Sequence, residues 1–103
     1  MMEMDPTQLR VRVMMSFQRA LLGVVTPSLR GVSVSWDEHR IRARFVYEAD
    51  DSRHVELVQE TETQVLADFG AEVVTDFAIE VTPNQSTLAL NEGEVWVYLR
   101  REA

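Results

Sequence analysis

The chain has 103 residues, of which 46% are hydrophobic and 26% charged, and these proportions predict one globular domain spanning residues 1–103. It contains no cysteine, which excludes disulfides, thiol catalysis and cysteine-ligated metal sites. Its formal net charge of −7 argues against nucleic-acid binding, because proteins with that function usually carry a basic excess.

The apolar runs and the N-terminal residues predict a cytoplasmic protein. No apolar run approaches the roughly 18 residues that span a membrane. The first residues, MMEMDP, are acidic and lack the basic start and the apolar stretch of a signal peptide. We therefore expect no membrane association, and we expect residues 1–4 to form a loose start.

A first helix is predicted to begin after Asp5. Asp5 suits the N-cap, Pro6 suits the first helical position, and Gln8 is placed to reach back as in a capping box. Thr26-Pro27 ends the predicted helix by about residue 25. One apolar stripe at spacings of three and four residues comprises Leu9, Val13, Phe17, Ala20 or Leu21, and Val24.

A β-hairpin is predicted for Val32–Tyr47, because apolar and polar residues alternate there on both sides of a short polar break. Glu38-His39 at the tip does not favour positive φ, so a loop of about four residues fits better than a tight primed turn. Matching the apolar faces pairs Trp36 with Ile41, Val34 with Ala43, and Val32 with Phe45.

A second helix is predicted from Arg53 to Phe69, after a polar break and before the terminating Gly70. Glu62 shares the apolar side, so it is expected either at the margin of the buried face or paired with an arginine. The apolar stripe comprises Val55, Val58, Val65, Leu66 and Phe69. The solvent side comprises Glu56, Glu60, Thr61, Gln64 and Asp68.

Two more strands are predicted near residues 72–82 and 94–100, separated by a turn at residues 83–86. In the last strand, alternation places Trp96, Tyr98 and Arg100 on one face. The predicted fold class is α+β, a two-layer α/β sandwich of order α-β-β-α-β-β. Its two helices cover one face of a four-stranded, mainly antiparallel sheet.

The other face of the sheet is then expected to carry arginines and aromatic residues. It is either an ordinary solvated face or a binding surface, since tryptophan, tyrosine and arginine are enriched in interface hot spots. Its members are Ser33, Ser35, Arg42, Arg44, Trp96 and Tyr98, or the alternate residues of the last strand if that strand is inverted.

No pattern in the sequence predicts catalysis, a cofactor or a metal site. His39 and His54 occupy ordinary surface positions without metal-ligand spacing. No serine lies in a G-x-S-x-G motif, and no glycine-rich phosphate loop exists among the four glycines. We therefore expect a protein that is not an enzyme.

Several segments together resemble a family of small acidic bacterial proteins. They are Arg19–Arg30 (RALLGVVTPSLR) followed by Val32 and Trp36, a loose T-E-x-x-A-D-F-like stretch at Thr63–Phe69, and YLRRE at Tyr98–Glu102. This family supplies no catalytic residues. By size and charge, small acidic proteins of this kind are often immunity proteins against contact-delivered or colicin-like toxins.

The leading hypothesis is therefore a non-enzymatic protein that neutralises a toxin by binding it. Many nuclease toxins are basic, and charge complementarity would speed their capture. The expected contacts are Glu48, Asp50, Asp51, Glu56 and Glu60. The alternatives are a homodimer that pairs through the arginine and aromatic sheet face, and a small-ligand or enzymatic pocket between the helices and the sheet.

Overall fold

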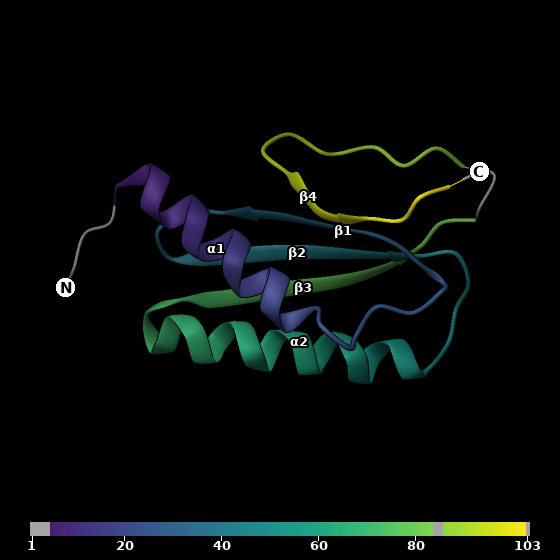
Figure 1. Cartoon of the computed structure of the whole chain (residues 1–103), viewed down its shortest axis with the longest axis horizontal. Coiled ribbons are helices and arrows are strands. Elements are labelled where there is room, and N and C mark those ends of the chain that lie inside the picture. Colours follow the sequence, from purple (N-terminus) through teal and green to yellow (C-terminus); the bar gives the residue numbers. More distant parts are fainter. Residues whose placement is uncertain (1–4, 84–85, 103) are drawn as a thin grey trace.

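The structure is a computed structural model that describes residues 5–83 and 86–102. The predicted loose start at residues 1–4 and the middle of the predicted turn at residues 83–86 lie outside the described residues. Figure 1 shows two helices on the same side of a sheet, in the predicted α-β-β-α-β-β order. The elements are α1 (Pro6–Ala20), β1 (Leu29–Trp36), β2 (Arg40–Tyr47), α2 (Arg53–Phe69), the short 3-10 helix η1 (Gly70–Glu72), β3 (Val74–Val81) and β4 (Val95–Leu99).

The sheet is mixed, so the prediction of a mainly antiparallel sheet was wrong. Its strand order is β3-β2-β1-β4; β1 pairs antiparallel with β2 and β4, whereas β2 pairs parallel with β3. The reason is α2, which carries the chain back along the sheet so that β3 starts beside the start of β2 (Figure 1). The alternating pattern of a strand predicts its faces, but it contains no information about its neighbour.

The β1–β2 hairpin has the predicted register, with Trp36 opposite Ile41, Val34 opposite Ala43, and Val32 opposite Phe45. The first strand starts earlier than predicted, at Leu29. Its pairing shifts between Leu29 and Gly31, which leaves Arg30 as the extra residue of a bulge. This irregularity is why simple alternation did not predict the beginning of β1.

Helix α1 begins as predicted, since the Gln8 backbone N–H donates to Asp5 Oδ1 at 2.9 Å and Pro6 is the first helical residue. It ends at Ala20, earlier than predicted, and a turn follows in which Gly23 has a φ of +79°. The predicted stripe nevertheless faces the core: Leu9 is partly buried, and the buried members are Val13, Phe17, Ala20, Leu21 and Val24.

Helix α2 has the predicted bounds, but it is rotated relative to the predicted apolar stripe. Val58 and Val65 are buried as predicted, whereas Val55 and Leu66 are 48% and 36% exposed. The rotation places the flank with Val55 and Leu66 beside the edge of the sheet, where Glu62 accepts a hydrogen bond from Thr75 Oγ1 at 2.7 Å. Glu62 is half-buried, and it has a hydroxyl partner in place of the arginine considered from the sequence.

His54 and Thr61 take the core positions on α2, so their predicted surface placement was wrong. Thr61 is fully buried because its hydroxyl donates to the Leu57 carbonyl at 2.9 Å, which satisfies the polar group within the helix. Neither described helix has the length and apolar character that crossing a membrane requires.

Candidate partner-binding surfaces

The predicted acidic contacts lie around the N-terminal half of α2. Glu48, Asp50 and Asp51 belong to the β2–α2 connection, and Glu56 and Glu60 project from the helix. Residues four apart share one side of a helix, and both Glu56 and Glu60 are exposed. The positive end of the helix dipole favours carboxylates at this place. The structure therefore brings the five acids to one end and one side of α2.

Two of these carboxylates have partners within the chain. Glu48 Oε1 lies 3.2 Å from Arg100 Nη1, and Asp51 Oδ2 lies 2.8 Å from Arg53 Nη2. The hydrogen bond from the Arg53 side chain lowers the pKa of Asp51 to about 2.

The other three, Asp50, Glu56 and Glu60, form no ion pair with any described residue, although each is exposed. Their carboxylates are therefore available to a partner.

The predicted pairing of Trp96 and Tyr98 on one sheet face was wrong. Trp96 lies opposite Ser33, but Tyr98 lies opposite Val32, and the register shifts between these pairs. Val97 is the extra residue, so the alternation reverses there. As a result, Tyr98 packs against the core beneath the helices, and Trp96 alone lies on the outer face.

Arg44 on the outer face binds the chain's own β3–β4 connection. Its Nε and Nη2 donate to the Glu94 carboxylate at 3.1 and 2.7 Å, and Nη2 also donates to the Ala89 carbonyl at 2.8 Å. Its Nη1 donates to Glu80 Oε2 at 3.0 Å, and its guanidinium lies 5.9 Å from the centre of the Trp96 ring. The hydrogen bond from Arg44 holds the pKa of Glu94 below its usual value.

The outer sheet face is consequently covered in part by residues of the same chain. β3 and β4 lie at opposite edges, so their connection crosses the sheet, and the bond from Arg44 to Ala89 places it on the outer face. Ser33 beneath it is fully buried, whereas Arg42 remains exposed. Of the predicted members of this face, Arg42 is exposed and Ser35 is half-buried, whereas Arg44 and Trp96 are engaged internally.

Arg30 is a structural centre that the sequence analysis missed. Its side chain is 1% exposed and donates hydrogen bonds to the connection that follows β3 and to the C-terminal segment. Nη1 donates to the Thr82 and Pro83 carbonyls at 3.2 and 2.9 Å, and Nη2 donates to the Ser86 carbonyl at 2.8 Å. Nε and Nη2 also bind the two Glu102 oxygens at 2.8 Å each. The bidentate pair is the geometry that suits arginine and carboxylate.

The same carboxylate also pairs with Arg100, whose Nη2 lies 2.9 Å from Glu102 Oε2. The hydrogen bonds from Arg30 and then Arg100 lower the pKa of Glu102 to about 2. The YLRRE motif at the C-terminal end therefore has a structural role, because it supplies one arginine and the acid that ties the chain end to β1.

A buried histidine stack joins α2 to the sheet. The rings of His54 and Tyr47 lie 3.5 Å apart at 11°, and His54 Nε2 lies 3.1 Å from Ser28 Oγ. A serine triad needs a carboxylate on the other imidazole nitrogen, but His54 Nδ1 has no partner among the described residues. The Tyr47 hydroxyl also lacks a described partner, and burial raises its pKa to about 12. This geometry supports packing, and it provides no orienting acid.

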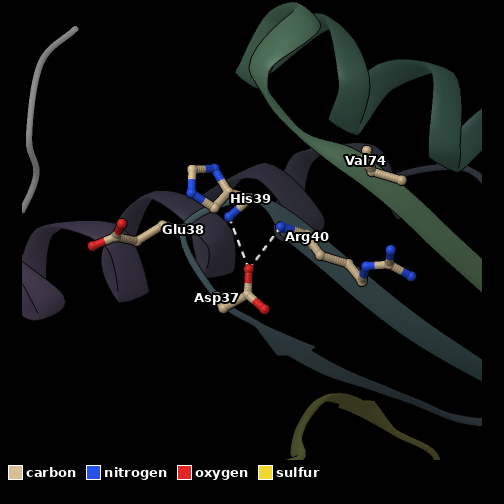
Figure 2. A pocket seen from close by; sticks show the side chains of 5 residues that line it. All are labelled: Asp37, Glu38, His39, Arg40 and Val74. Atoms are coloured by element: carbon tan, nitrogen blue, oxygen red, sulfur yellow. Dashed lines mark hydrogen bonds between the residues drawn. The ribbon is translucent and has the colours of Figure 1, made fainter.

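An open hollow of about 430 Å³ lies at the hairpin tip, lined by Asp37, Glu38, His39, Arg40 and Val74 (Figure 2). Asp37 Oδ1 accepts the backbone N–H groups of His39 and Arg40 at 2.8 and 2.9 Å, so it closes the turn. The bond from His39 lowers the pKa of Asp37. Glu38 and His39 point to different sides in Figure 2. Among the described residues, no three histidine or acidic side chains gather closely enough to hold a metal ion.

Comparison with known proteins gives one family match. A search of curated proteins finds no match to this chain. The model of the MafI2 immunity protein family matches residues 10–102, which span both helices and all four strands apart from the first turn of α1. The match confirms the resemblance to an immunity-protein-like family that the Arg19–Arg30 and Tyr98–Glu102 segments indicate. The chain belongs to the MafI2 immunity protein family.

Proposed function

We propose that this protein neutralises a basic toxin domain by binding it, without catalysis, through the acidic side of α2. The family supports a toxin as the partner. The observation that carries the choice of surface is the set of exposed carboxylates at Asp50, Glu56 and Glu60, which form no ion pair with residues 5–83 or 86–102. A net charge of −7 adds a long-range attraction toward a basic partner.

The outer sheet face supports a partner less well than α2 does. Arg44 and Trp96 already hold the β3–β4 connection, so a partner or a second copy would have to displace that segment to reach them. On α2, in contrast, a partner meets side chains that make no competing ion pair with described residues. Binding there would break no ion pair between these carboxylates and a described residue.

Growth rescue identifies the toxin, and charge reversal then tests the surface. Candidate toxin domains from the genome that encodes this chain are expressed one at a time, with and without this protein, and the rescued toxin is purified. We expect Glu56→Arg with Glu60→Arg to slow association about tenfold at low salt and to flatten its salt dependence.

The matched control is Glu38→Arg with Glu92→Arg, which changes the net charge equally at two exposed positions away from α2. We expect this control to retain most of the association rate. Equal effects of the two double variants, or no effect of the α2 variant, would contradict the proposed surface.

A further inference from the structure

β3 is an edge strand with a long and regular free side. It pairs with β2 without interruption from Val74 to Val81, and no described strand lies on its other side. It contains no proline and no lysine, residues that commonly protect such edges. Because its pairing with β2 has no register shift, β3 presents a regular row of backbone groups with which a further strand can form hydrogen bonds.

The internal hydrogen bonds show which backbone groups face that free side. The Val74 N–H donates to the His39 carbonyl and the Thr82 N–H donates to the Tyr47 carbonyl, both at 2.8 Å. In a parallel pair, alternate residues direct their backbone groups to the partner strand. The even-numbered residues of β3 therefore bond to β2, and the N–H and C=O groups of Thr75, Phe77, Ile79 and Val81 point away from it.

Exposed apolar side chains accompany this free edge. Ile79 and Val81 are 36% and 46% exposed on the helix side of β3. The adjoining flank of α2 adds Val55 and Leu66, which share one side with the Glu62 that binds β3. An added strand would cover these four side chains with its own apolar residues.

The opposite side of β3 carries two acids, Asp76 and Glu80, which alternate with the apolar Val74 and Ala78. Asp76 is exposed, and Glu80, which forms an ion pair with Arg44 at 3.0 Å, keeps 44% of its side chain exposed. Across the β2–β3 pair, Asp76 is the neighbour of Arg42, so the charges alternate from strand to strand. A strand next to β3 therefore fits best when its outer side chains are arginine or lysine, because like charges opposite each other are destabilising.

A second copy of this chain does not supply the basic side chains that the outer side of β3 favours. Its own β3 would bring two more carboxylates and no cation to the outer side of the new strand pair. A basic partner, in contrast, complements Asp76, Glu80 and the net charge of −7.

We propose that a β-strand of the toxin adds to the free edge of β3, with apolar side chains toward α2 and alternate basic side chains toward Asp76 and Glu80. This inference rests on the proposed function, and it specifies how the toxin is held beside the acidic helix. Backbone hydrogen bonds along β3 would provide affinity, and the alternation of apolar and basic residues would provide specificity.

The test compares edge variants in binding to the toxin that growth rescue identifies. Ile79→Pro removes an outward N–H without removing a β2–β3 hydrogen bond, and we expect its affinity to fall at least about tenfold. Its control is Leu99→Pro on the other edge strand, β4. The Arg100 N–H donates to the Arg30 carbonyl of β1, so the N–H of the preceding Leu99 points away from the sheet, and its loss also removes an outward donor only. We expect this control to bind like the wild type.

A second pair keeps the test decisive if a proline variant fails to fold. Ile79→Lys places a charge where an apolar contact is expected, and Met15→Lys places the same charge on α1 at a side chain that is 62% exposed. Circular dichroism and thermal unfolding show which variants are folded. The proposal is supported if the folded Ile79 variants bind the toxin more weakly and the folded Leu99→Pro and Met15→Lys controls do not.

The failures of the two proposals are distinguishable. If the toxin binds wild type and folded Ile79 variants equally, strand addition is overturned and toxin binding stands. If no candidate toxin is bound or rescued, the proposed function is overturned and this inference falls with it. A dimer of the free protein by light scattering that dissociates in Ile79→Lys assigns the edge to a second copy and also overturns the inference.

Discussion

The two edges of the sheet differ in how much of the chain is used to protect them. β4 has five residues, a bulge at Val97, and a hydrogen bond at 3.1 Å from Gln18 Nε2 to the Val97 carbonyl. β3 has eight residues, an uninterrupted register and exposed apolar side chains. Proteins usually blunt exposed edges, so the contrast between the two edges supports the proposal that a partner binds along β3.

The protected side depends on two arginines more than on the length of its strand. Arg30 and Arg44 together hold the β3–β4 connection and the C-terminal segment through carbonyl and carboxylate acceptors. On β3 itself, Arg44 binds Glu80 and Thr75 binds Glu62, but these bonds join side chains and no described side chain bonds to the outward backbone groups of the strand. The proposal places binding on the outward side of β3, whereas the two arginines hold the β3–β4 connection and the C-terminal segment, so substitutions can separate the two roles.

The largest stability effect is expected at Arg30. Arg30→Met removes the donors of three carbonyls and a carboxylate, and we expect the free energy of unfolding to fall by about 3 kcal/mol. Urea unfolding measures the loss, with the exposed Arg101→Met as the matched control. Equal stabilities of the two variants would show that the Arg30 network does not hold the β4 side.

A smaller effect is expected from Gly31→Ala in β1. A Cβ at this position would lie 2.7 Å from a Trp96 ring carbon and 3.3 Å from the Tyr98 carbonyl oxygen, so the rigid indole must move. We expect a loss of about 1–3 kcal/mol. In a Trp96→Leu background the penalty shrinks, and a constant penalty in this double-mutant cycle would locate the cost elsewhere.

The Glu102 carboxylate is expected to make stability depend on acid pH. Its pKa is lowered to about 2 from an ordinary value of about 4.3. The ionised carboxylate therefore stabilises the folded state in full when the pH is above this ordinary value. This contribution is lost as the pH falls through the range between the two values. Glu102→Gln should flatten that part of the stability curve, whereas Glu92→Gln in the exposed connection should leave it unchanged.

The smallest effect is expected at Gln18, which supplies a single hydrogen bond to the bulge. Gln18→Ala should cost about 0.5–1 kcal/mol and speed amide exchange near Val97, with Gln59→Ala on the exposed side of α2 as control. Toxin affinity should not change, because this edge is not the proposed binding edge. A loss of affinity in Gln18→Ala would weaken the contrast between the two edges.

Local patterns were sufficient to predict the hairpin register, the N-cap at Asp5 and both ends of α2. Each depends on residues close together in the chain, such as alternation around a break or Gly70 after the last helical turn. The features that were missed depend on long-range contacts. The parallel partner of β3 follows from the path of α2 over the sheet, and the bulge at Val97 reverses the faces of Trp96 and Tyr98.

The candidate site shows the same division. Exposure of Glu56 and Glu60 followed from helix periodicity, but the engagement of Glu48, Arg44 and Trp96 within the chain did not. Arg30 resembled a surface residue because its hydrogen-bond partners are all far away in the sequence. The available signals were the position of Arg30 between Leu29 and Gly31 and the presence of Glu102 near the C-terminal end.

Amide hydrogen exchange of the free protein and of its complex with the identified toxin tests most directly whether the open edge is the binding edge. We expect exchange of the outward amides of Thr75, Phe77, Ile79 and Val81 to slow strongly in the complex, with α2 residues 55–66 slowed less and β4 unchanged. Slowing on β4 or on the outer sheet face, with β3 unaffected, would contradict the assignment of binding to the β3 edge.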